Sequence, residues 1–111
     1  MHSADITVSE YLVFWMGDLA GGAGTMDGDD VLAWSRNPSF VANTARFSGL
    51  DGDLSRWFSD WASSGSLDRE LEIHDRQLNR RIHLQDVTLA AWQPGEYYIV
   101  TFREARVVEL E

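Results

Sequence analysis

The most regular pattern in the chain lies near its middle and predicts an amphipathic helix over about residues 53–64. Asp53 is a good N-cap, because its carboxylate can accept hydrogen bonds from the unpaired amides of the first turn. Gly65 supplies a left-handed stop. The apolar residues between them recur at i, i+3, i+4 and i+7, which places them on one helix face; they are Leu54, Trp57, Phe58 and Trp61. We expect this stripe to pack on a sheet or on another chain.

The chain after this helix switches to a two-residue alternation, which is typical of half-buried β-strands. Leu71 and Ile73 alternate with charged residues, and a second alternating run begins at Ile82. From Val87 onward the apolar residues fall on the opposite parity. This one-residue slip predicts a β-bulge near Gln85–Asp86.

A turn and a further alternating run complete this half of the sequence. Pro94-Gly95 has proline and glycine at the two central positions of a turn, where each is preferred. Beyond it, apolar residues share one face of a single long final strand; they are Tyr98, Val100, Phe102, Val108 and Leu110.

The N-terminal half is less regular. Residues 1–9 are polar and predict an arm, whereas aromatic and β-branched residues predict a buried strand over Glu10–Met16. Val31–Ser35 predicts a second strand, and Phe40–Phe47 a third strand or an early helix. Residues 17–30 carry five glycines and several aspartates, which predict a flexible acidic loop.

One helix among about six strands predicts a mainly β fold, a β-sandwich or barrel that the helix closes on one side. The 111 residues are expected to form a single domain over 1–111, and a hydrophobic content of 44% is sufficient for a packed core. The absence of cysteine excludes disulfides, thiolate nucleophiles and cysteine-ligated zinc.

The charge balance limits the partners that we expect. A formal net charge of −9 repels nucleic-acid phosphates and anionic membranes, so sequence-specific nucleic-acid binding and membrane binding are not expected. The longest apolar run, Tyr11–Met16, is too short to cross a bilayer. No cationic segment precedes a long apolar stretch, so we expect synthesis in the cytoplasm without a signal peptide.

The sequence contains no complete catalytic motif. Its serines lack the Gly-x-Ser-x-Gly context, and Gly21-Gly22-Ala23-Gly24 lacks the Gly-Lys-Ser/Thr ending of a phosphate-binding loop. His74 and His83, with Asp86, are a candidate zinc set if they meet across a hairpin near Leu78. The alternative is that both histidines lie on a solvated sheet face. We therefore expect no enzymatic activity, no cofactor and no metal site.

Several residues are candidates for contacts with another chain. The residues of the 17–30 loop are expected to become ordered on a neighbour. Trp92, beside the turn, is an interface anchor or a cap on the barrel end. The final strand and the short first strand are expected to leave edges free for pairing. The candidate interface residues are Gly21, Gly22, Gly24, Asp27, Asp29, Asp30, Trp92, Val108 and Leu110.

The order of elements resembles the tube-forming fold of phage tail-tube proteins and of the haemolysin-coregulated protein of type VI secretion. Phe47–Gly65 is similar to that family's strand end, aspartate turn and helix. Val31–Ser35 resembles its second strand, Ile82–Gln93 its Leu-x-Asp-Val strand, and Val100–Val108 its last strand. The resemblance implies a non-enzymatic structural protein that forms a homo-oligomeric ring, commonly a hexamer. It also implies neighbouring tail or tube proteins as partners and a location in a virion tail or an injection or secretion tube.

Because the chain is shorter than typical members of that family, it is expected to form a tube, a single ring, or an adaptor or terminator at a tube end. A rival resemblance connects Gly65–Ala105 with the last three strands of PAS domains, and Asn37–Phe40 with the start of their central helices. It implies a small-molecule sensor or dimerisation domain with an apolar pocket. Small size and acidity alone suggest a third function, an immunity protein that binds a toxin.

Overall fold

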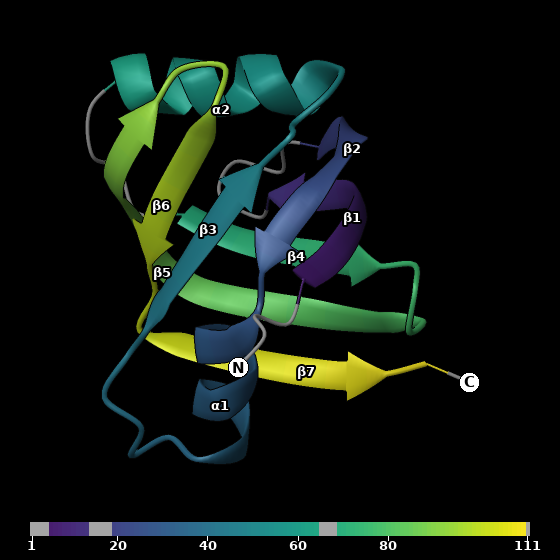
Figure 1. The fold of residues 1–111 in the computed structure, drawn as a ribbon, viewed down its shortest axis with the longest axis vertical. Coiled ribbons are helices and arrows are strands. Elements are labelled where there is room, and N and C mark those ends of the chain that lie inside the picture. Colours follow the sequence, from purple (N-terminus) through teal and green to yellow (C-terminus); the bar gives the residue numbers. More distant parts are fainter. Residues whose placement is uncertain (1–4, 14–18, 65–68, 111) are drawn as a thin grey trace.

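The computed structural model describes residues 5–13, 19–64 and 69–110 and shows a mainly β protein (Figure 1). Two helices lie among the described strands, and neither is long and apolar enough to span a membrane. The helices are α1 (Asp29–Arg36) and α2 (Asp53–Ser63). The strands are β1 (Asp5–Val13), β2 (Leu19–Asp27), β3 (Thr44–Ser48), β4 (Arg69–Asp75), β5 (Arg80–Gln93), β6 (Tyr97–Thr101) and β7 (Glu104–Glu109).

The strands form one antiparallel sheet in the order β4-β1-β2-β3-β6-β5-β7, and β4 also pairs with β5. This additional pairing closes six strands into a barrel and leaves β7 outside the closed ring, alongside β5. The first half of β5 pairs with β4 and β7, and its second half pairs with β6. In Figure 1, α2 lies across one end of the barrel and α1 lies beside β7 near the other. The predicted mainly β fold is confirmed, with two helices where one was expected.

A bulge allows both halves of β5 to place apolar side chains in the core. Between Leu84 and Val87, β5 uses one residue more than β4 does. Asp86 there has a φ of 51°, a left-handed conformation that aspartate tolerates better than most residues. The extra residue reverses the side-chain alternation, so Leu84 and Val87 are both buried. The bulge predicted near Gln85–Asp86 is confirmed.

The single long final strand predicted from the alternation is two strands, β6 and β7. They follow one another along β5, but Phe102 and Arg103 interrupt the ladder between them. The interruption lies opposite the β5 bulge. Here too the alternation of buried and exposed side chains shifts by one residue, so that the buried positions are even-numbered up to Phe102 and odd-numbered from Ala105. Val108 and Leu110 therefore do not share the apolar face of β6. They are exposed instead.

The residues predicted as a second strand, Val31–Ser35, form most of helix α1. Two aspartates in its first turn and an arginine in its last turn complement the helix dipole. Val31 is buried, and Trp34 packs edge-on against Phe102 with 6.1 Å between the ring centroids. The prediction was wrong because a run of four apolar residues does not distinguish a buried strand from one side of a short helix.

The glycine-rich stretch predicted as a flexible loop forms β2, which pairs with β1 and β3. A Cβ on Gly22 would meet the backbone oxygen of Asp51 at 2.1 Å, and one on Gly24 would meet the Leu50 side chain at 2.7 Å. These two glycines allow β2 to approach the segment before α2 closely. Residues 17 and 18 of the predicted loop lie outside the described ranges.

The other predictions for the N-terminal half hold only in part. β1 begins at Asp5, so the second half of the predicted arm is strand, and residues 14–16 of the predicted first strand lie outside the described ranges. The strand predicted over Phe40–Phe47 begins at Thr44. β1 pairs with β2 on one side and β4 on the other. The free edge expected at the N-terminal strand is therefore wrong.

Helix α2 covers its end of the barrel with the predicted apolar stripe (Figure 1). Its members are Leu54, Phe58 and Trp61, which are buried, and Trp57, which is half-buried. The ring of Phe58 lies 5.2 Å from that of Phe47 and 5.2 Å from that of Tyr98, measured between centroids. These contacts hold the helix on β3 and β6.

The start of α2 differs from the prediction. The N-cap position is Gly52, and Asp53 is the first helical residue. No side chain caps the helix, although the Asp51 carboxylate accepts a hydrogen bond from the Gly52 amide at 2.7 Å. Asp53 still places a negative charge in the first turn. Gly65, the predicted stop, lies outside the described ranges.

The turn predicted at Pro94-Gly95 is confirmed and joins β5 to β6. The Glu96 amide donates to the Gln93 carbonyl at 2.9 Å, and Gly95 has a φ of 82°. A positive φ at this position favours glycine.

We predict that Phe58→Ala lowers the free energy of unfolding by about 3–5 kcal/mol, because it removes a fully buried ring from the barrel end. Trp57→Ala lowers it by less, because Trp57 is half-buried. Denaturant titration followed by circular dichroism measures both changes. Unchanged stability of both variants would show that α2 does not pack on the barrel.

We also predict that Gly22→Ala destabilises the domain by about 1–3 kcal/mol, because its Cβ would overlap backbone that cannot easily move. Gly21→Ala is the matched control, since a Cβ at Gly21 has no neighbour within 4 Å. Thermal melting of the two variants measures the difference. Equal melting temperatures would contradict the packing role of Gly22.

Candidate binding groove

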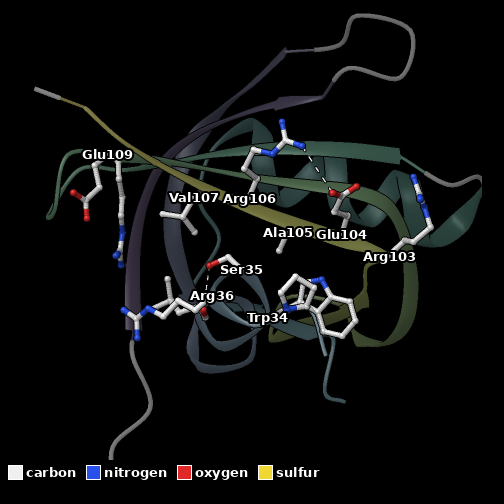
Figure 2. Close-up of a pocket in the computed structure, with 12 residues that line it drawn as sticks. Trp34, Ser35, Arg36, Arg103, Glu104, Ala105, Arg106, Val107 and Glu109 are labelled. Carbon is white, nitrogen blue, oxygen red and sulfur yellow. Dashed lines mark hydrogen bonds and ion pairs between the residues drawn. The ribbon is translucent and has the colours of Figure 1, made fainter. Parts of the chain in front are cut away.

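A groove of about 710 Å³ lies between α1 and β7 (Figure 2). Its volume falls within the roughly 300–1,000 Å³ that is usual for ligand-binding clefts. Trp34 and Arg36 belong to the α1 side, and residues 103–107 with Glu109 belong to the sheet side. This groove, called the edge groove below, is the candidate functional site.

The edge groove runs along the border of β7. Figure 2 shows Ala105 and Val107 on the side of β7 that faces Trp34, and Glu104 and Arg106 on the opposite side. Because successive residues of a strand point to opposite faces, a groove lined by all four follows the strand's edge. It therefore gives access to the backbone of β7 as well as to its side chains.

β7 has one sheet neighbour within the described chain, β5. The Leu110 amide donates to the Asn79 carbonyl at 2.9 Å, toward the β5 side. Backbone groups of successive residues in an antiparallel strand point to alternate edges. The amides and carbonyls of Val107 and Glu109 therefore point away from β5. No described strand pairs with them.

The edge groove is rich in arginine although the chain is acidic. The sequence has no lysine, and its nine basic residues are all arginine. Four of these arginines line the groove, together with two glutamates. The rest of the chain holds five arginines and sixteen acidic residues. Arginine side chains are thus concentrated beside β7.

One groove arginine has a structural role. Arg80 Nε donates to the Asp75 carboxylate at 2.7 Å, and Asp75 is only 3% exposed. The same carboxylate accepts hydrogen bonds from the amides of Gln77 and Leu78, in the turn between β4 and β5. Arg80 therefore neutralises a buried charge that organises this turn.

The other three arginines differ in how firmly they are held. Arg103 donates to the Asp86 carboxylate at the β5 bulge, and this hydrogen bond, with the charge of Asp86, raises the pKa of Arg103. Arg106 lies 3.8 Å from Glu104, and both side chains are exposed, so the pair is weak. Arg36 is exposed and has no ion-pair partner among the described residues. Arg36 and Arg106 are thus the arginines that remain for a negatively charged ligand.

The two histidines lie along one face of the β4–β5 hairpin. His74 Nε2 lies 3.2 Å from Glu72, and His83 Nε2 lies 3.7 Å from Glu70. Each histidine therefore has a glutamate as its own neighbour, and Asp86 is paired with an arginine instead. In residues 5–13, 19–64 and 69–110, no three His, Cys, Asp or Glu side chains are grouped as a metal site.

The predicted interface residues are dispersed over the molecule. Gly21, Gly22 and Gly24 belong to β2, and the last two serve close packing. The three aspartates line a second hollow of about 340 Å³; they are Asp27, Asp29 and Asp30. The Thr44 hydroxyl donates to Asp30 there at 2.7 Å.

The exposed apolar residues of the predicted interface lie at two places. Trp92 is 41% exposed near the turn between β5 and β6. Val108 and Leu110, exposed by 49% and 37%, lie at the end of β7 on the face opposite Ala105. Neither lines the edge groove, although Val108 lies in β7 between Val107 and Glu109, which do.

The sequence pattern does not predict the edge groove. It places Trp34 in a strand and singles out neither Arg36 nor Arg106. The available signal was the use of arginine alone as the basic residue, with Arg103 and Arg106 close together near the end of an acidic chain.

We predict that Arg80→Met lowers the free energy of unfolding by about 3–5 kcal/mol, because the Asp75 carboxylate would stay buried without its cation. Arg36→Ala is the control, since an exposed residue without an ion pair contributes about 0.5 kcal/mol or less. Denaturant titration compares the two. A small loss for both variants would show that the buried pair does not stabilise the turn.

Comparisons of the chain with family models, with curated proteins and with solved structures find no match. The tail-tube and PAS resemblances therefore stay predictions, and the function is inferred from the edge groove and the backbone beside it.

Proposed function

We propose that this chain is a non-catalytic assembly protein that binds other protein chains by accepting an extended strand at the edge of β7. The observation that supports this proposal is a strand with a single sheet neighbour in the described chain, bordered by a groove. Addition of a strand to such an edge is a common mode of peptide recognition, in which main-chain hydrogen bonds supply the affinity.

The edge of β7 is poorly protected. Closing a sheet into a barrel removes its edges, and open sheets usually protect theirs with charges, prolines or a covering segment. β7 carries charges at Glu104, Arg106 and Glu109, but Val107 and Val108 are apolar and the strand contains no proline. An edge of this kind is suited to pairing.

A ring or tube of identical subunits, as the tail-tube resemblance implies, is one form of this function. A ring whose sheets join edge to edge needs two free edges on every subunit, because each subunit has two neighbours. Among the described strands, the barrel offers this kind of edge at β7, whereas β1 is paired on both sides. A ring would therefore need a second contact, for which the second half of β5 is available, since it pairs with β6 alone among the described strands and carries exposed Trp92.

The sensor alternative needs an apolar ligand pocket in the domain. Large buried side chains fill the barrel interior instead; among them are Phe47, Phe58, Trp61, Tyr98 and Phe102. We therefore do not propose a small-molecule sensor. An immunity protein would also bind a protein partner, and strand addition at β7 applies to it equally.

We predict that Glu109→Pro weakens the binding of other chains at least about tenfold, because it removes an outward-pointing amide and its hydrogen bond from the edge. The ladder with β5 is spared, since it uses the amide of Leu110. Glu109→Gln is the matched control, because it removes the same charge and keeps the amide.

Light scattering at increasing concentration and capture from extracts of the source cells measure binding by the parent chain and both variants. We expect a bound chain, either a second copy or another protein, that Glu109→Gln retains and Glu109→Pro loses. Circular dichroism verifies that both variants are folded. The absence of any bound chain, or equal binding by all three proteins, would contradict the proposal.

A further inference from the structure

We infer that the strand accepted at β7 is an acidic, extended segment of a partner protein. It carries a carboxylate beside Arg106 and apolar side chains on the positions that face α1. This inference rests on the proposed function and names the chemistry of the partner.

The edge groove has two walls, which favours a single extended segment over a second copy of the barrel. β7 forms one wall, and α1 forms the other with Trp34 and Arg36 (Figure 2). An added strand lies about 4.8 Å from β7 and so occupies the space between these walls. A second copy that paired through its own β7 would also bring its β5 and α1 against the wall formed by α1. Two copies with net charge −9 each also repel one another.

The positions of the added strand that face α1 meet an apolar surface. Ala105 and Val107 lie on this side of β7, and Leu32 and Trp34 line the groove from α1. Val107 and Trp34 are only partly buried, so both have apolar surface left to cover. Because side chains alternate along a strand, every second residue of the occupant faces this surface. Apolar residues are favoured at those positions.

The positions on the other face of the added strand lie beside Glu104, Arg106 and Val108. Opposite charges on directly paired residues of neighbouring strands stabilise the pairing. Arg106 is a good partner for a carboxylate, because a guanidinium can donate two parallel hydrogen bonds to it. Its present contact with Glu104, at 3.8 Å between exposed side chains, is weak enough to be exchanged.

Arg36 supplies a second positive charge on the opposite wall. It lies toward the same end of the groove as Glu109 (Figure 2). Outside the groove, acidic residues outnumber arginines by sixteen to five, so a basic segment would be attracted to many places on the molecule. The clustering of arginine beside β7 instead singles out this edge for an acidic segment.

Selection from a phage-displayed library of random eight-residue peptides tests the inference. We expect the parent chain to enrich peptides in which Asp or Glu alternates with apolar residues. A synthetic enriched peptide should bind more weakly as salt is raised, and its variant with lysine in place of the acidic residues should not bind.

Matched variants locate the peptide on the molecule. Arg36→Ala and Arg106→Ala should each lower the affinity for the synthetic peptide by about two- to fivefold. Arg56→Ala removes an exposed arginine of α2 outside the groove and should leave the affinity unchanged. Glu109→Pro should abolish binding, and Glu109→Gln should retain it.

The outcomes separate this inference from the proposed function. If Glu109→Pro abolishes binding of the selected peptides but these peptides show no preference for acidic residues, the inference is overturned and strand addition still stands. Self-association through β7 that excludes peptides would have the same consequence. Peptide binding that is indifferent to Glu109→Pro would overturn both. Failure to enrich any peptide would overturn the inference, and the capture experiment would then decide on strand addition.

Discussion

The pairing of β4 with the first half of β5 is the interaction on which the rest of the structure depends. It closes the barrel and occupies one edge of that half of β5, so β7 pairs along the other edge and lies outside the closed ring. The bulge at Asp86 makes this arrangement compatible with one continuous core. It reverses the alternation of inward- and outward-facing side chains at the point where β5 stops pairing with β4 and β7 and begins to pair with β6. The Asp75–Arg80 pair holds the turn at the end of this hairpin. The edge groove exists because β7 extends beyond the ring and α1 packs beside it.

The parts of the fold that follow from local periodicity were predictable. The stripe of α2, the alternation of β4 and β5, and the slip at Gln85–Asp86 each leave a repeated pattern over several residues. The errors fall where the pattern is short or where tertiary contacts decide. Val31–Ser35 is too short to reveal its period. Gly22 and Gly24 suggest flexibility in the sequence, and only their closeness to Asp51 and Leu50 shows that they serve packing.

The candidate site was less predictable, because it depends on which strand edge stays unpaired. Pairing edges are expected from the sequence at both the first and the last strand, whereas in the described chain β1 pairs on both sides and β7 has one sheet neighbour. The break at Phe102–Arg103 moved Val108 and Leu110 away from the apolar face assigned to them. Arg36 reaches the groove only because its segment is helical and packs beside β7. Each of these facts is a matter of topology, for which a single sequence carries no periodic signal.

The exposed border of β7 also bears on how the molecule behaves when it has no partner. Unpaired strand edges tend to pair with one another and cause aggregation, and the border of β7 carries this hazard. The excess of carboxylates over the remaining surface opposes it, because it keeps separate molecules apart before their borders can meet. The acidity of this chain thus favours colloidal stability and opposes pairing between copies at this border.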